Sequence, residues 1–305
     1  VYNDRQTAVA GEIGGKYDMI PINLSFSKAG NNKKKEYKYN IVTDPFFFPN
    51  ILAGLAMSTV YKEDSKNSEG SIVFKAEIKV KNLKTGKVDI IKMHDFFIGT
   101  NIRAMYSSLV TLIKPLQYLI YNWYAEVKIE NISIKLKKIP KYQVANIEKA
   151  ILLNKEIRPG DKVKMRLLFK IYKGGYISKN ISFNIPKNIT STKAKIYISS
   201  AKLENLTYKY GYSPLFKPKS YSQLIKNFRY NSSYNDLALW IDKPEIGAVV
   251  NGYYLPNLPI SKLASYVFRV QGHKFLRKRR QLKIVKTNYL IAGYIIVPIY
   301  ITHDE

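Results

Sequence analysis

Cysteine is absent from the 305 residues of this chain, and histidine occurs only three times. The lack of cysteine excludes disulfide bonds, thiolate catalysis and cysteine-ligated metal sites, although it does not fix the cellular compartment. The histidines, His94, His273 and His303, are scattered, and none belongs to a ligand pair with the spacing of a zinc site. We therefore expect neither a metal ion nor another cofactor.

Acidic residues are scarce, 22 against 50 lysines and arginines, so the formal net charge is +28. A basic surface attracts phosphate, anionic lipid or acidic polysaccharide. Most lysines are dispersed, which favours the alternative that they solvate the outer faces of strands. One local cluster is the candidate polyanion-binding site, formed by Lys274, Arg277, Lys278, Arg279, Arg280 and Lys283. Too few aromatic residues surround it for a base-stacking platform, so specific nucleic-acid binding is not expected.

Known catalytic signatures are missing from the sequence. It has no glycine-rich dinucleotide fingerprint, phosphate loop, HExxH motif or GxSxG elbow. The nearest approach to a nucleophile turn is Ser71 in "EGS", which we interpret as part of a loop leading into a strand. His94 and Asp95 are neighbours, and neighbouring side chains of a strand point to opposite faces. A partly exposed loop histidine is therefore favoured over a catalytic or metal-binding pair.

Long apolar runs are also missing. The first residues lack the charged start and apolar stretch of a secretory signal. The segment "YLIAGYIIVPIYI" is strongly apolar, but it is too short for a membrane-spanning helix and Pro298 interrupts it. We interpret it as a buried pair of strands.

The strongest positive signal is the alternation of apolar and polar residues, which is typical of strands in a sheet with one wet face. Residues 74–81 and 162–171 follow this pattern, as do residues 19–26, where we expect the buried face to hold Ile20, Ile22, Leu24 and Phe26. In residues 127–136 the alternation shifts by one at Glu130 and Asn131, which predicts a β-bulge. Glycines in "LKTGKV", "IRPGDKV" and "YKGGYI" predict tight turns between strands.

Helices are a minority. The patterns predict one at 44–64, a second at 101–124 that is kinked or broken before Pro115, a third at 220–231 capped by Ser220 or Ser222, and a short fourth at 258–268. The sequence therefore predicts a mainly β protein of antiparallel β-sandwich domains, one immunoglobulin-like, with a few helical insertions. We expect a β domain with two helical insertions at 1–139, an immunoglobulin-like sandwich at 140–212 and a mixed helix and strand part at 213–305.

Several passages together suggest a family. "DRQTAVAGEIGG", "MIPINLSF" and "YNIVTDPFFFPNILAGLAM" are followed by "IEKAILLNKEIRPGDKVKMRLLFKIYKGG" and "KPEIGAVVNGYYLPNLPISKLA". This series resembles the region that follows the catalytic core in large bacterial exported proteins with a peptidase domain like that of stage IV sporulation protein B. The likeness is spread over nearly the whole chain.

The chain departs from that family where catalysis is concerned. The family's peptidase core uses a serine in an "SGSP"-like turn and a histidine in a "GHP"-like turn, and neither motif occurs here. No catalytic residue is therefore carried over. The resemblance implies a peptidase domain upstream of this chain, and an exported setting in the periplasm, at the outer membrane surface or outside the cell.

The opening stretch "TAVAGEIGG" offers little side chain to bury, and glycine loses more entropy than other residues when it is ordered. Such a segment becomes ordered when its backbone pairs with a sheet edge. We expect it to be an assembly segment that leads out of the upstream domain, with Ala8, Val9, Gly11, Ile13 and Gly14 as its candidate residues.

These observations favour a non-catalytic exported module of the cell envelope or surface that serves in assembly or binding. The expected partners are an upstream peptidase domain or another envelope protein, further copies of the chain in an oligomer or filament, or an anionic polysaccharide or lipid. Two alternatives stay open: a fragment of a serine endopeptidase whose catalytic residues lie upstream, and a polyanion-binding module.

Overall fold

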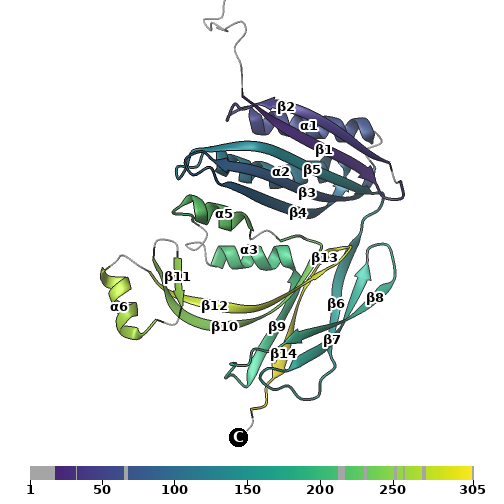
Figure 1. The fold of residues 1–305 in the computed structure, drawn as a ribbon. Helices are drawn as coiled ribbons and strands as arrows, with labels where there is room; N and C mark the ends of the chain where they lie inside the picture. The colour runs from purple at the N-terminus through teal and green to yellow at the C-terminus, as the bar shows by residue number, and fades with distance from the viewer. Residues whose placement is uncertain are drawn as a thin grey trace, which may run out of the picture.

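The computed structural model describes residues 18–31, 33–64, 68–211, 217–229, 232–250, 253–256, 258–269 and 273–303. The fold is mainly β, with three sheets whose strands pair mostly antiparallel and with few helices, as the alternation predicted. The sheets are arranged in an upper part with two helices and a lower part with two sheets (Figure 1).

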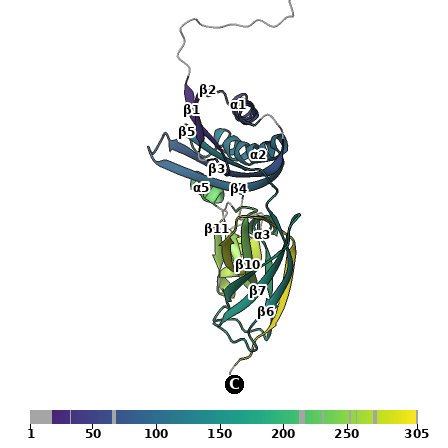
Figure 2. The same ribbon diagram turned by 90° about the vertical axis from the view of Figure 1, so that its right-hand side faces the viewer.

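The upper part is a five-stranded sheet in the order β2-β1-β5-β3-β4. β1 and β5 pair in parallel, and the other neighbours are antiparallel. Both helices of this part cover the same face of the sheet (Figure 2). The elements are β1 (Met19–Lys28), β2 (Lys34–Val42), α1 (Phe48–Glu63), β3 (Glu69–Asn82), β4 (Val88–Thr100), α2 (Asn101–Ile120) and β5 (Val127–Ile139).

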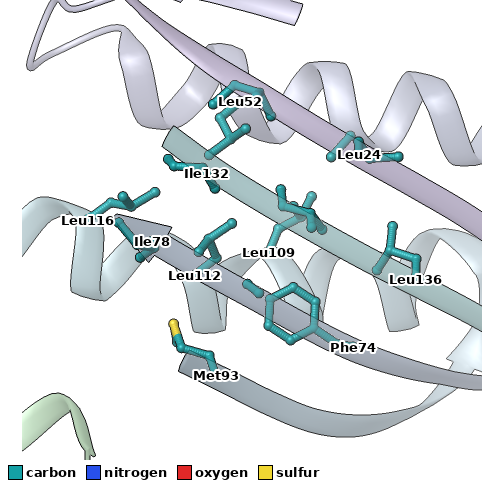
Figure 3. Close-up of a cluster of buried hydrophobic side chains, with 14 of the residues drawn as sticks. Leu24, Leu52, Phe74, Ile78, Met93, Leu109, Leu112, Leu116, Ile132 and Leu136 are labelled. Atoms are coloured by element: carbon teal, nitrogen blue, oxygen red, sulfur yellow. The ribbon is translucent and has the colours of Figure 1, made fainter. Parts of the chain in front are cut away.

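The first hydrophobic core lies between this sheet and its helices (Figure 3). Alternate strand residues face the helices, which is why the two-residue pattern identified them correctly. The buried set includes Ile20, Ile22, Leu24 and Phe26 of β1 and Phe74, Ala76, Ile78 and Val80 of β3. The bulge in β5 is also confirmed: Asn131 pairs with Lys79 and Ile129 with Val80, so Glu130 is the extra residue. The bulge returns both apolar sets of β5 to one face.

The helix predicted at 101–124 is confirmed by α2, but α2 continues through Pro115, so the predicted break is wrong and the alternative of a kink stays a prediction. A proline inside a helix removes a hydrogen bond and costs about 3 kcal/mol. Leu109 and Leu112 before the proline and Leu116 and Leu119 after it are all buried in the first core. Each buried side chain of this size contributes about 1.5–3 kcal/mol, so packing on one sheet outweighs the local cost.

The lower part contains a four-stranded sheet, β13-β6-β7-β8, and a second sheet in the order β11-β10-β9-β14, to which β12 adds by pairing with β10. Its strands are β6 (Val144–Leu152), β7 (Lys162–Ile171), β8 (Tyr176–Asn184), β9 (Lys193–Ser200), β10 (Asp236–Val250), β11 (Tyr253–Pro256), β12 (His273–Lys286), β13 (Leu290–Ala292) and β14 (Tyr294–Tyr300). The helices of this part are α3 (Ala201–Gly211), α5 (Tyr221–Arg229) and α6 (Ile260–Arg269).

The second core takes its residues from both of these sheets, among them Val163, Met165 and Phe169 of β7 and Ile196, Leu239 and Ile299 of the other sheet. It therefore joins strands from either side of residue 212. Ile225 of α5 belongs instead to the first core. The domain limits at 139 and 212, and the immunoglobulin-like character of the middle part, stay predictions.

The apolar segment 289–301 does form two strands, but they do not pair with each other, and β14 is not buried throughout, because Tyr294, Ile296 and Tyr300 are exposed. β13 pairs in parallel with β6, and β14 pairs antiparallel with β9 in the other sheet. Gly293 makes the change of sheet with a φ of +86°, and a Cβ there would lie 2.8 Å from the side-chain oxygen of Asn146. Pro298 is accommodated because β14 ends the order of its sheet.

The helix predictions at 44–64, 220–231 and 258–268 are confirmed by α1, α5 and α6, and Ser220 caps α5 by accepting a hydrogen bond from the Gln223 N–H (3.3 Å). α3 was not predicted. Its N-cap is Ser200, whose hydroxyl oxygen accepts the Leu203 N–H (3.2 Å). A serine at this position is the signal that could have found the helix.

Candidate functional site

The upper and lower parts meet at a polar cluster that begins with His94 and Asp95 of β4. Three further residues complete this junction cluster: Lys202 of α3, Ser233 before β10 and Asp236 at the start of β10. His94 lies within a strand, so the prediction of a loop histidine is wrong, although its side chain is partly exposed as expected. As strand geometry requires, His94 and Asp95 bind different partners.

Asp95 is the centre of the junction cluster. Its side chain has no exposed surface, and Lys202 Nζ donates to its Oδ2 at 2.7 Å. Its Oδ1 accepts the backbone N–H groups of Phe96 (2.9 Å) and Tyr234 (3.0 Å) and the hydroxyl of Ser233 (3.3 Å). A buried carboxylate is tolerated when it is paired and hydrogen-bonded in this way.

His94 pairs with a second carboxylate, because its Nε2 lies 3.0 Å from Oδ2 of Asp236. The hydroxyl of Ser233 forms hydrogen bonds with Asp95 and Asn235. A serine nucleophile would instead have its hydroxyl hydrogen-bonded to the histidine imidazole. The contacts of the junction cluster are thus those of a structural link between β4, α3 and β10.

A cavity of about 480 Å³ adjoins Asp95 between β4, α2, α3 and α5. Apolar side chains form most of its wall, and Lys114 and Lys202 add two cations. The carboxylate of Asp95 is already engaged by four donors, so the cavity's polar character comes mainly from these lysines. Sequence reasoning missed the cavity because distant elements form it together, and its contact between Asp95 and Lys202 joins residues 107 positions apart.

Ser71 is not in a loop as predicted but inside β3, and its side chain is buried. Its hydroxyl donates to the Lys141 carbonyl (2.9 Å) and accepts the Gln143 N–H (3.0 Å), so it fastens the chain after β5 to β3. Nearby, Lys138 and Asp64 form a buried ion pair, and Lys138 Nζ also donates to the Ser68 hydroxyl (2.7 Å). Both arrangements are structural.

The basic cluster lies on β12, which pairs with β10 along 14 positions. Glu245 is opposite Arg277 and Asp242 is opposite Arg280, whereas Lys278 and Arg279 are opposite Pro244 and Lys243. The side chains of Lys274 and Arg277–Arg280 lie outside the described part of the structure. Lys283 is described: its Nζ donates to the Ser182 carbonyl (2.6 Å) and so ties β12 to β8.

The candidate assembly residues Ala8, Val9, Gly11, Ile13 and Gly14 all lie before residue 18 and therefore outside the described residues. In the part that is described, β1 is an inner strand, because β2 and β5 occupy both of its edges. Any pairing of the opening stretch stays a prediction.

A surface feature that sequence reasoning missed is a group of exposed aromatic side chains beside α1 and α2. We call it the aromatic patch and define it by Phe46, Phe47, Tyr118, Tyr121 and Trp123. The density of aromatic letters in "PFFFP" and "YLIYNWY" was the available signal.

Within the described ranges there is no group of three or more histidine, aspartate or glutamate side chains that could hold a metal ion. No helix in the same ranges has both the length and the apolar character required to cross a membrane. Comparisons of the chain with models of protein families, with curated proteins and with solved structures found no match.

Proposed function

We propose that this chain is a non-catalytic module of the cell envelope or surface that binds an anionic polymer. The observation that carries the proposal is the position of the basic cluster on β12. Six basic residues fall within ten positions of one strand, from Lys274 to Lys283. At about 3.3 Å per residue they extend over roughly 30 Å, which suits an extended polyanion.

The strand pairing supports this interpretation. β10 has β9 and β11 along one edge and β12 along the other, so β12 is the outer strand on that side among the described strands. Two of its basic residues are opposite carboxylates, but Lys278 and Arg279 are not. The centre of the cluster therefore has a surplus of positive charge.

The exported setting is part of the same proposal and is supported by the resemblance to the region that follows a sporulation-type peptidase domain. An upstream peptidase domain or another envelope protein would then hold this module in the envelope. The binding of an anionic polysaccharide would be the contribution of this chain.

The test uses heparin as the polyanion and compares two variants that each remove four positive charges. The first is R277Q/K278Q/R279Q/R280Q. The matched control is K84Q/K155Q/K162Q/K187Q, whose four lysines are exposed and dispersed. Each cation that contacts the polymer steepens the fall of affinity with salt. Because neighbouring side chains of a strand point to opposite faces, two of the four cations share a face, and we expect the first variant to reduce the slope of log affinity against log salt by about two and the control to leave it unchanged.

Equal slopes for the two variants, or an unchanged slope for the first, would contradict the proposal, because binding would then depend on overall charge alone. Thermal unfolding of both variants verifies that the comparison is made between folded proteins.

A further inference from the structure

The aromatic patch gathers side chains that are normally buried or partly buried. Trp123 is 97% exposed, Phe46 71% and Tyr118 64%. Exposed apolar side chains that occur singly need no explanation, whereas a group of them marks an interaction surface.

Side-chain contacts bring members of the patch together. Tyr121, just after α2, donates its hydroxyl to the Pro45 carbonyl (3.1 Å), which places the end of α2 beside the residues that precede α1. The rings of Phe46 and Phe47 are in edge-to-face contact, with centroids 5.0 Å apart. Tyr118 lies one helical turn before Tyr121.

Polar side chains fix both loops that carry the patch. Oδ1 of Asp44 accepts the N–H groups of Phe46 (2.9 Å) and Phe47 (2.8 Å). Asn122 donates to the Leu119 carbonyl (2.6 Å) and accepts the N–H groups of Tyr124 and Ala125, so it brackets Trp123. The aromatic rings therefore project from ordered turns.

Exposed lysines lie near the patch, beside the acidic residues Asp44 and Glu126. Lys114 lies one turn before Tyr118 and is exposed. Tyr124 donates its hydroxyl to the Pro218 carbonyl (2.5 Å), which brings the exposed Lys217 and Lys219 to the same end of α2. These lysines add to a chain whose net charge is +28.

We propose that the aromatic patch inserts into the headgroup region of an anionic bilayer. Tryptophan and tyrosine favour this region because they have an apolar ring and a polar group. Flanking lysines add attraction to anionic headgroups. A bilayer is the proposed partner because exposed tryptophan and tyrosine rings lie here beside exposed lysines, and the headgroup region of an anionic bilayer favours both. The inference does not depend on polymer binding by β12.

Insertion can be measured by the intrinsic tryptophan fluorescence of the protein, because its two tryptophans are Trp123 and the buried Trp240. The whole chain is mixed with vesicles of phosphatidylcholine that contain about one third phosphatidylserine, which gives them an anionic surface. We expect a blue shift of the emission and quenching by brominated lipid. The W123F variant loses the quenching.

Binding is then measured by cosedimentation for Y118S/W123S and for the control Y106S/Y300S. Tyr106 and Tyr300 are as exposed as Tyr118, and Tyr106 is about 18 Å away along α2. Removing two inserted rings should weaken vesicle binding by roughly tenfold or more, whereas the control should bind as the unaltered chain does.

Equal vesicle binding by both variants would overturn the inference. A dimer that is dissociated by Y118S/W123S but not by the control would also overturn it, because the patch would then be covered by a second copy of the chain. Heparin affinity should be unchanged in Y118S/W123S. The heparin measurements therefore test the β12 proposal, and the vesicle measurements test the bilayer proposal separately.

Discussion

At the residue scale, a hydrogen-bonded group of three side chains lies at the outer edge of the first sheet. It consists of Lys35, Tyr37 and Glu63. Lys35 Nζ lies 2.7 Å from Glu63, and Tyr37 donates its hydroxyl to the same carboxylate. The Lys35 and Tyr37 hydrogen bonds lower the pKa of Glu63. The hydrogen bond to Glu63, with some burial, raises the pKa of Tyr37 to about 12. Each group thus holds the other in one protonation state.

The raised pKa of Tyr37 predicts a loss of stability in alkali. The unfolded chain releases this proton near pH 10 and the folded chain near pH 12, so the unfolded state binds fewer protons in between. Stability should be fully present below pH 10 and fall as the pH rises towards 12. We expect Y37F to show a shallower fall than the unaltered chain when urea midpoints are compared over this range. Parallel curves would show that the bond contributes nothing.

At the element scale, each helix and strand is decided by what it packs against. α2 keeps its helical path through Pro115 because leucines on both sides of the proline are buried on the same sheet. β1 is an inner strand because β2 and β5 flank it, and its four alternate apolar residues reach the core. The described strands of the upper part all begin at or after Met19.

This arrangement leads to a prediction for the opening stretch. Deletion of residues 1–15 should leave a chain that unfolds cooperatively and is monomeric, because every pair of β1 begins at or after Met19. Self-association should become weaker if the stretch adds a strand to another copy. Sedimentation velocity and thermal unfolding of the shortened and full chains measure both effects. Loss of the unfolding transition would instead show that the stretch is an integral strand of the upper part.

At the scale of the whole molecule, two cores are linked through the junction cluster. Asp95 joins β4 to α3 and to the segment before β10, and Ile225 of α5 joins the first core from a position after β9. A segment that follows β9 in the sequence therefore packs in the first core, so the two cores do not correspond to two successive halves of the chain. A polar change in this link should affect the whole fold.

The prediction at this scale concerns Asp95. D95A leaves the Lys202 ammonium without its buried partner and the Tyr234 N–H without an acceptor, which should lower the free energy of unfolding by roughly 3 kcal/mol. S233A removes one neutral donor and should cost about 1 kcal/mol. Urea unfolding of both variants gives the comparison. Equal effects would show that the carboxylate is not the centre of the junction.

Local patterns were sufficient wherever one face of an element alone is buried. The alternation in β1 and β3 identified their buried residues, and the parity change near Glu130 located the bulge, because a strand's side chains alternate strictly between two faces. The mainly β fold and the helices α1, α2, α5 and α6 followed from the same kind of signal.

Tertiary structure alone decided the features that depend on distant residues. The sequence of α2 carries a helix breaker, yet burial on both sides of Pro115 outweighs it. The segment 289–301 reads as one apolar run, yet Gly293 sends its two halves to different sheets. His94 and Asp95 acquire their roles from partners more than 100 residues away, and the aromatic patch exists because two loops meet at the end of α2. Periodicity reports which face of an element is apolar, but only the packing of distant segments determines what that face meets.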